Sequence, residues 1–110
     1  MSDRRVPDPS QGVYGISVAA DLVGMAPQTL RLYEERGLLE PERTAGGTRR
    51  YSQDDLDRLH RIGELVGDGL NLAGVAAVLI LERDNARLRH QNSRMRKQRK
   101  DASRGSRPTR

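Results

Sequence analysis

The hydrophobic positions near the start of the chain repeat at helical spacing and predict two short helices joined by a tight turn. In the first helix the inward residues are Ile16, Ala20 and Val23. Ser17 is a suitable N-cap for this helix, and Gly24 is expected to break it. Because glycine interrupts the helical pattern, the chain can turn directly into a second helix.

The second predicted helix has one inward and one outward side. Pro27 suits its first position, because a proline there loses no hydrogen bond, and Gly37 is expected to end it. Leu30 and Tyr33 fall together on the side that packs into a core. The outward side is centred on Gln28, Leu32 and Glu35 and is flanked by Thr29, Arg31 and Arg36. An exposed side of this kind can enter the groove of a nucleic acid.

A hairpin is predicted next, over the segment EPERTAGGTRRYS that begins at Glu40. Gly46 and Gly47 are expected to supply the positive φ angles of the turn, and the second arm contains Thr48 to Tyr51. Three arginines surround the turn, namely Arg43, Arg49 and Arg50. The expected fold class is therefore mainly α, a winged helix-turn-helix with a small β-hairpin wing and a C-terminal dimerisation helix.

Two further helices are predicted after the hairpin. Ser52 to Asp55 forms a capping box that opens the third helix. The inward face of this helix is expected to comprise Leu56, Leu59, Ile62 or Gly63, and Val66. Residues 67–69 should stop it, and Asn71 can cap a fourth helix over residues 72–82. The fourth helix is apolar on nearly every side, so it must be covered on more than one face.

From Val78 onwards the apolar positions follow a heptad pattern. Alternating steps of three and four place Val78, Leu81, Asn85, Leu88, Asn92 and Met95 on one seam of a short coiled coil over residues 78–100. The two asparagines can pair and fix the register at a cost in stability. We therefore expect a weak but specific homodimer, and the heptads leave open whether its helices run parallel or antiparallel.

Both ends of the chain are polar and are expected to be disordered. Residues 1–12 are rich in proline and predict a flexible arm, and residues 101–110 predict a disordered basic tail. Residues 94–110 carry eight basic groups and one acid, a net charge of +7, so residues 1–93 sum to −2. Any affinity of the folded part for nucleic acid must then come from a local cluster of cations, helped by the tail.

Composition excludes several functions. Without cysteine, phenylalanine or tryptophan, the chain has a thin aliphatic core, no disulfide and no thiolate metal site. His60 and His90 lie on separate predicted helices without a paired carboxylate, so we expect no catalytic site, no metal and no cofactor. No apolar run approaches the roughly 20 residues of a membrane span. The protein is expected in the cytoplasm, associated with the nucleoid.

The segment ISVAADLVGMAPQTLRLYEERGLLEPERTAGGTRRYS resembles the DNA-binding domain of the MerR family of transcription regulators. Together with the later GLNLAGV it looks most like the HspR branch, the repressors of heat-shock genes, and the resemblance covers residues 13–82. It implies that Thr29 and Arg31 approach base edges or phosphates in the major groove, while Tyr33 and Arg36 reach the DNA backbone. Leu32 departs from the tyrosine that is common at its position in the family.

The chemistry of the outward residues leaves some alternatives open. Gln28 can bond an adenine edge with two hydrogen bonds, and Leu32 either touches a thymine methyl or is an ordinary exposed leucine. Glu35 can accept from cytosine but is better explained as a solvated residue. The wing arginines suit phosphate or minor-groove contact. The expected DNA-contacting set is Ser17, Gln28, Thr29, Arg31, Leu32, Tyr33, Arg36, Arg43, Thr48, Arg49, Arg50 and Tyr51, the last with a core role first.

We interpret the sequence as a homodimeric repressor that occupies an inverted-repeat operator on double-stranded DNA. Repression is favoured because the chain leaves no room for the effector pocket of MerR-type activators. The HspR resemblance implies chaperone genes as targets and a DnaK-type chaperone as corepressor, although no residue by itself indicates DnaK binding. Two alternatives stay open: a small cooperative or architectural DNA binder without a stable dimer, and a helical protein-interaction adaptor.

Overall fold

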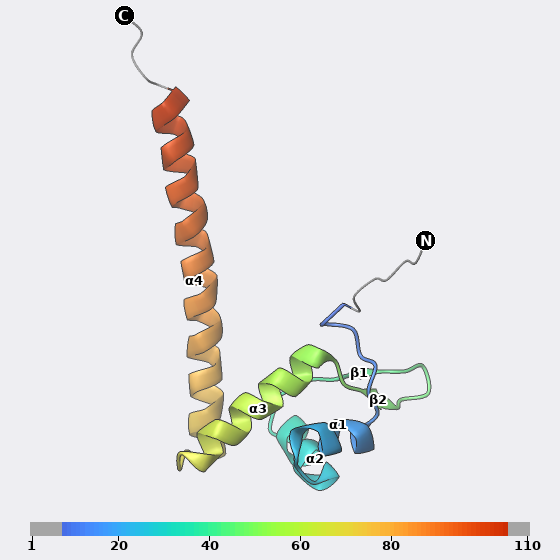
Figure 1. Cartoon of the computed structure of the whole chain (residues 1–110). Coiled ribbons are helices and arrows are strands. Elements are labelled where there is room, and N and C mark those ends of the chain that lie inside the picture. The colour runs from blue at the N-terminus through green and yellow to red at the C-terminus, as the bar shows by residue number, and fades with distance from the viewer. Residues whose placement is uncertain (1–7, 106–110) are drawn as a thin grey trace, which may run out of the picture. The chain divides into compact units, whose positions relative to one another are not determined.

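The computed structural model describes residues 8–105 of the chain. It is mainly helical, with a two-stranded hairpin and a long C-terminal helix, as the sequence predicts (Figure 1). The elements are α1 (Ile16–Val23), α2 (Pro27–Glu35), β1 (Glu42–Arg43), β2 (Arg49–Arg50), α3 (Gln53–Gly67) and α4 (Leu72–Gly105). The chain divides between Ala76 and Ala77 into an N-terminal and a C-terminal compact unit.

Helix α1 begins earlier than the capping prediction requires. Gly15, and not Ser17, is the N-cap residue, and no side chain caps the helix. Ser17 lies exposed in the first turn, because Ile16 is already helical and the Ala19 amide donates to the Gly15 carbonyl over 2.9 Å. The capping prediction for Ser17 is therefore wrong. The buried residues of α1 are Ala19 and Ala20, whereas the expected inward residues Ile16 and Val23 are only half-buried.

Helix α2 begins at Pro27 and has its stop signal at Gly37, as predicted. Gly37 has a φ of 75°, its amide donates to the Glu34 carbonyl over 3.0 Å, and the Leu38 amide donates to the Tyr33 carbonyl over 2.9 Å. This pair of bonds is a Schellman motif, which needs a residue in the left-handed conformation. The same motif at Gly24, with a φ of 70°, closes α1 and produces the tight turn into α2.

Helix α3 opens with the predicted capping box. The Ser52 hydroxyl accepts from the Asp55 amide over 3.0 Å, and the Asp55 carboxylate accepts from the Ser52 amide over 2.9 Å. The buried positions are Leu56, Leu59, Ile62 and Leu65. The expectation for Val66 is wrong, since its side chain is 39% exposed. With 3.6 residues per turn, each step of three moves the buried face by about 60° around the helix, so in the last turn Leu65 takes the place assigned to Val66.

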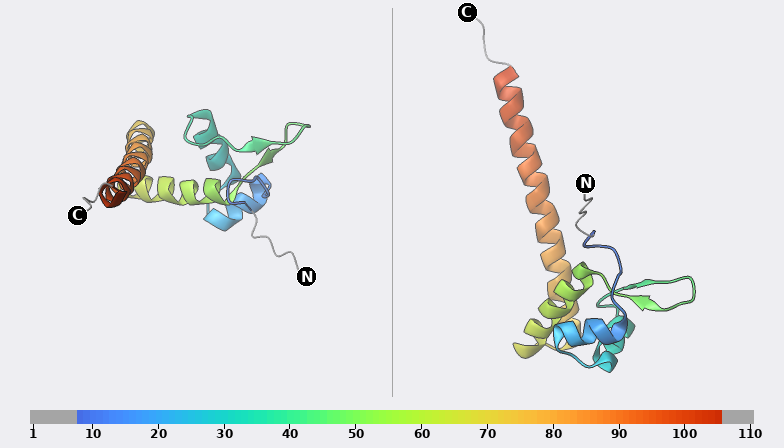
Figure 2. Two further views of the ribbon diagram at one scale, coloured as in Figure 1. Left: turned by 90° about the horizontal axis from the view of Figure 1, so that it is seen from above. Right: turned by 45° about the vertical axis from the view of Figure 1, so that its right-hand side comes forward.

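The wing is an antiparallel pair in which Glu42 lies opposite Arg50 and Arg43 lies opposite Arg49. Only one of the two turn glycines has a positive φ: Gly47 at 87°, whereas Gly46 lies in the ordinary region, contrary to the sequence prediction. A three-residue loop makes the second positive φ unnecessary, because the Gly47 amide donates to the Thr44 carbonyl over 2.8 Å and closes a turn that needs only one left-handed residue after it. Figure 2 shows the hairpin tip projecting away from α1, α2 and α3.

The chain before α1 is not disordered from residue 8 onwards, contrary to the prediction for residues 1–12. The Gly12 amide donates to a carboxylate oxygen of Glu42 in the wing over 2.7 Å, and the Asp54 amide donates to the Pro9 carbonyl over 3.0 Å. Further along the same segment, Tyr14 forms an antiparallel β-bridge with Tyr51. Backbone bonds to the wing and to α3 thus hold a segment whose composition alone suggests flexibility. Residues 1–7 lie outside the described part.

The core of the N-terminal unit is small and almost entirely aliphatic, as predicted. Its fully buried side chains are Tyr51, Leu30, Leu38, Leu59, Ile62 and Val75. A hydrogen bond from a side chain to the backbone also closes the core: the Arg58 guanidinium on α3 donates to the Leu38 carbonyl after α2. Within residues 8–105 no helix is long and apolar enough to cross a membrane.

Helix α4 runs without interruption from Leu72 to Gly105, where the sequence suggested a separate fourth helix followed by a coiled-coil segment. Asn71 caps it as predicted, because its side-chain oxygen accepts from the Gly74 amide over 2.8 Å. The helix continues past Asp101 to Gly105, into the segment for which the sequence predicts a disordered tail. Residues 106–110 lie outside the described part.

Candidate nucleic-acid interface

The outward side of α2 is exposed as the sequence predicts. Gln28, Arg31, Leu32, Glu35 and Arg36 all face solvent, and Thr29 is half-buried at the edge. Pro27 and the two Schellman turns fix the start and end of the helix, and Leu30 and Tyr33 anchor its other side at 0% and 7% exposure. The helix therefore offers one polar side on a rigid support.

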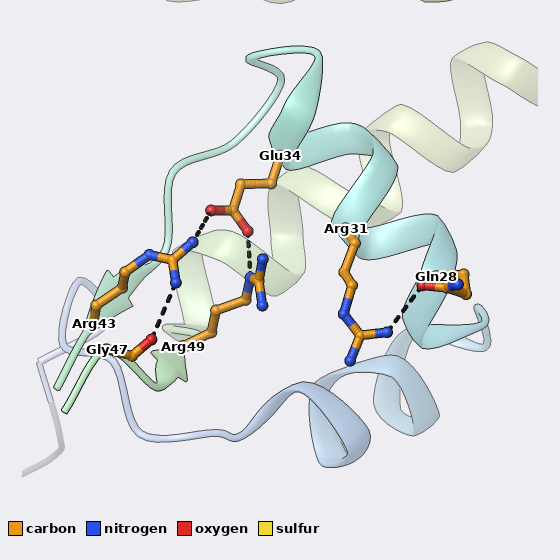
Figure 3. A network of polar contacts seen from close by, with 6 residues as sticks. All are labelled: Gln28, Arg31, Glu34, Arg43, Gly47 and Arg49. Carbon is orange, nitrogen blue, oxygen red and sulfur yellow. Dashed lines mark hydrogen bonds and ion pairs between the residues drawn. The ribbon is translucent and has the colours of Figure 1, made fainter.

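Gln28 and Arg31 interact with each other on this side. The Arg31 guanidinium donates to the side-chain oxygen of Gln28 over 2.9 Å (Figure 3). The predicted pairing of Gln28 with adenine needs that oxygen as an acceptor for the base amino group. In the observed arrangement Arg31 uses one of the two lone pairs of that oxygen, and the remaining N–H groups of the pair are donors. Donors alone match the two acceptors of a guanine edge better than an adenine edge.

Two of the three wing arginines are bound to a single carboxylate on α2. Glu34 accepts from the Arg43 guanidinium over 2.6 Å and from the Arg49 guanidinium over 2.5 Å, one oxygen to each (Figure 3). Arg43 also donates to the Gly47 carbonyl over 3.0 Å. Glu34 is not among the residues that the sequence predicts for this site. One signal in the sequence could have indicated it: Glu34 is an acid at the edge between the buried and exposed sides of α2, and a hairpin rich in arginine follows this helix.

The charge state of Glu34 follows from this arrangement. The side chain is only 18% exposed, and this burial raises its pKa, but the hydrogen bonds and charges of Arg49 and Arg43 outweigh the burial. The net result is a pKa for Glu34 below the ordinary value. Hydrogen bonding to Glu34, opposed by desolvation, likewise leaves the pKa of Arg49 raised. The Glu34 carboxylate is therefore ionised near neutral pH.

Arg50 differs from the other two wing arginines. It is half-buried, and its side chain has no hydrogen bond or ion pair with any residue in the described range 8–105. Glu42, directly opposite it in the hairpin, uses a carboxylate oxygen to accept from Gly12. Arg50 is thus the wing cation whose charge is available to an incoming anion.

The remaining candidate residues are divided between surface and core. Ser17 and Thr48 are exposed, but the two tyrosines are not: Tyr33 is 7% exposed and Tyr51 is 0% exposed. The Tyr51 hydroxyl has no hydrogen-bond partner among the described residues, and burial raises its pKa. The core role expected first for Tyr51 is observed. A phosphate contact by Tyr51 would require the side chain to leave the core.

The predicted seam in α4 is exposed over most of its length. Leu81 is 67% exposed, Leu88 54% and Met95 55%, whereas Val78 is half-buried. Asn85 and Asn92 on the same seam also face solvent. An apolar row of this length on an isolated helix is the expected appearance of a surface that a partner helix covers.

The described residues offer little for chemistry. No group of three or more histidine, cysteine or acidic side chains within residues 8–105 is placed to hold a metal ion. His60 and His90 are both exposed on separate helices. A surface hollow of about 420 Å³ beside the wing is lined by Gly12, Glu42, Arg43, Thr44 and Arg50. None of the side chains that line it is a nucleophile paired with a base.

A short helix, a glycine turn, a second helix with an exposed basic side and a hairpin fixed to that helix define a winged helix-turn-helix protein. Comparison of the sequence with known families identifies its kind. The profile of the MerR HTH family of regulatory proteins matches residues 14–80. The chain belongs to this family, whose members are regulatory proteins and not enzymes, in agreement with the sequence prediction.

Individual relatives include a heat shock protein and a transcriptional regulator. A candidate heat shock protein HspR from Streptomyces coelicolor is 51% identical over 77 residues, which is 69% of this chain and 51% of that protein. The HTH-type transcriptional regulator GlnR from Bacillus anthracis is 38% identical over 80 residues, 73% of this chain and 59% of that protein. The chain thus spans about half to three-fifths of the length of these relatives.

A solved structure with a similar fold contains DNA. HiNmlR, a MerR family regulator that lacks the sensor domain and was crystallised bound to promoter DNA, superposes with a TM-score of 0.57 at 27% sequence identity. The match covers 83% of this chain and 76% of that one.

Proposed function

We propose that this protein is a sequence-specific DNA-binding transcription regulator that acts as a homodimer. Helix α2 enters the major groove with Gln28 and Arg31 outwards, and the wing lies along the flanking backbone with Arg50 towards phosphate. The observation that carries the proposal is the exposed polar side of α2 next to a wing that an ion-pair cluster ties to the same helix. The promoter-bound relative HiNmlR supports it.

The proposed output is repression of stress genes. It rests on the 51% identity to the candidate heat shock protein HspR, which exceeds the 38% identity to the HTH-type transcriptional regulator GlnR. A DnaK-type chaperone as corepressor rests on the HspR resemblance alone, and no described residue recommends it. A genome-wide map of bound sites tests this output: sites upstream of chaperone genes support it, and sites elsewhere contradict it.

The DNA-binding proposal is tested with Arg31→Ala. This substitution should abolish the preference for the operator over a scrambled duplex, because Arg31 is the outward cation best placed for base edges. Arg83→Ala, an exposed arginine in α4, is the matched control and should leave that preference unchanged. Titration of both duplexes decides the matter. An Arg31 variant with full preference would remove α2 from the interface.

A second candidate is a small cooperative DNA binder that has no stable dimer in solution. It is favoured by Asn85 and Asn92, which occupy two of the six seam positions and weaken any coiled coil. Sedimentation of the free protein separates the two candidates. A dimer at micromolar concentration supports the first, and a monomer that still pairs on an inverted repeat supports the second.

A further inference from the structure

Glu34 lies where the second helix and both strands of the wing meet. Its two carboxylate oxygens accept from Arg43 on β1 and from Arg49 on β2, so one side chain from α2 joins both arms of the hairpin (Figure 3). The partners are 9 and 15 residues away along the chain. The bonds are short, the carboxylate is largely buried, and charge-assisted bonds of this kind are among the stronger ones in proteins.

The hairpin needs such a carboxylate for its own stability. Arg43 and Arg49 lie directly opposite each other in the register of the two strands. Like charges at opposite positions of an antiparallel pair repel and destabilise it. A carboxylate placed between the two guanidinium groups turns this repulsion into two attractions. The cost of removing Glu34 therefore falls first on the wing.

The same contact changes which charges DNA encounters. Arg43 and Arg49 with Glu34 carry a net charge of +1, and the guanidinium atoms that bind Glu34 are not available to phosphate. Arg50 keeps its charge unpaired among the described residues. The wing thus presents fewer free cations than its three arginines suggest.

We propose that Glu34 is a positioning residue for DNA recognition: it fixes the wing to α2 and withholds Arg43 and Arg49 from unspecific phosphate contact. This inference rests on the proposed DNA-binding function. A wing that is already aligned with the reading helix loses less conformational freedom on binding than a loose one. Arginines that are released from Glu34 attract the backbone of any sequence equally, since phosphate contacts carry no sequence information.

The test compares Glu34→Gln with Glu35→Gln. Both substitutions remove one negative charge from neighbouring positions of α2, but Glu35 is exposed and, within residues 8–105, forms no ion pair. We expect Glu34→Gln to lower the preference for operator over scrambled DNA by about tenfold relative to Glu35→Gln, the effect of losing charge-assisted bonds. The slope of log affinity against log salt on scrambled DNA should steepen by up to about 1.8, for two released phosphate contacts.

A measurement without DNA separates this proposal from the proposed function. Amide exchange of Thr44 and Thr48, which bond to each other across the hairpin, should be faster in Glu34→Gln than in Glu35→Gln. If the wild type bound no duplex, the proposed function would fall, and equal exchange in the two variants would overturn the link to the wing independently.

The double variant Glu34→Gln/Arg49→Gln guards against a general loss of folding. If the two residues act through each other, it should discriminate between duplexes no worse than Arg49→Gln alone. Additive losses would overturn the proposal. So would an unchanged operator preference in Glu34→Gln, or a lower preference with an unchanged salt slope, because the arginines would then not have been withheld from phosphate.

Discussion

The two compact units of this protein differ in the contacts that stabilise each of them internally. In the N-terminal unit, side chains bond to partners far along the chain: Gly12 to Glu42 and Glu34 to Arg49, separations of 30 and 15 residues. In the C-terminal unit, the ion pair between Arg87 and Asp84 joins neighbours on one helical turn, three residues apart. The large apolar side chains of the first unit are mostly buried, whereas several of those in the second are exposed.

The N-terminal unit therefore has a defined arrangement without a partner, whereas the C-terminal unit is expected to need one. Long-range bonds give the N-terminal unit one arrangement of helix and wing before any ligand arrives. The exposed apolar side chains of the C-terminal unit have no such long-range bonds, and a helix with a heptad pattern is only marginally stable in water without a partner. The unit that we propose to bind DNA is therefore preorganised, and the unit that we propose to form the dimer depends on its partner for stability.

The largest effect should come from paired truncations, one in each unit. Leu30→Ala removes a fully buried side chain and should lower the free energy of unfolding by about 2–5 kcal/mol. Leu88→Ala truncates a side chain that is 54% exposed and should cost less than about 0.5 kcal/mol at high dilution. Urea unfolding at two protein concentrations measures both. An equal loss in the two variants at high dilution would contradict the contrast between the units.

Leu88→Lys should disperse the dimer, because it places two unpaired charges in the seam. A cost of about 2 kcal/mol or more corresponds to a dissociation constant raised roughly 30-fold. His90→Lys adds the same group at an exposed position off the seam and is the control. Analytical ultracentrifugation of each variant provides the comparison. If both variants sedimented as the wild type does, the seam would not be the dimer interface.

Stability should depend on pH through Glu34. Its pKa in the folded protein lies below the ordinary value, so the ion pairs contribute stability above the unfolded pKa, and this contribution is lost as pH falls through the folded pKa. The difference in unfolding free energy between wild type and Glu34→Gln should therefore be constant from roughly pH 5 to 7 and shrink below about pH 4. Urea titrations at stepped pH measure it. A difference that persists at the lowest pH would be inconsistent with an ionised Glu34 as its source.

The smallest effect should distinguish two adjacent arginines. Arg50→Ala should weaken binding to operator and scrambled DNA alike and flatten the salt slope by about 0.9, the loss of one phosphate contact. Arg49→Ala should also lower discrimination, because it removes one partner of Glu34. The sequence predicts that both arginines act alike, and the ion pair separates them. Identical binding profiles for the two variants would restore the simpler view.

Local signals accounted for most of the fold. Gly24 and Gly37 stop their helices as predicted, and the capping box from Ser52 opens α3, because each depends on residues only a few positions apart. The sequence prediction was wrong where two similar neighbours competed for one place. Leu65 and Val66 lie on either side of the direction in which Ile62 points, about 60° and about 40° away on a regular helix, and only the packed structure shows which of them is buried.

The candidate site was less accessible to sequence reasoning. The exposed side of α2 followed from periodicity, but the binding of Arg43 and Arg49 to Glu34 depends on how the hairpin folds back against the helix. No local pattern encodes that distance. The same holds for residues 8–12, whose composition suggested disorder although their backbone bonds to the wing and to α3 order them.

At Gly12 the ordered segment before α1 leaves no space for a side chain. A Cβ atom at this position would lie 2.5 Å from the Arg50 carbonyl oxygen and 2.8 Å from a Glu42 carboxylate oxygen, so even a methyl group does not fit without displacing backbone. The segment before α1 thus acts as a strap over the base of the wing. For protein engineering this means that a substitution at position 12 acts on the same strands that carry Arg43, Arg49 and Arg50. For evolution it means that position 12 is constrained by space, independently of any contact with DNA.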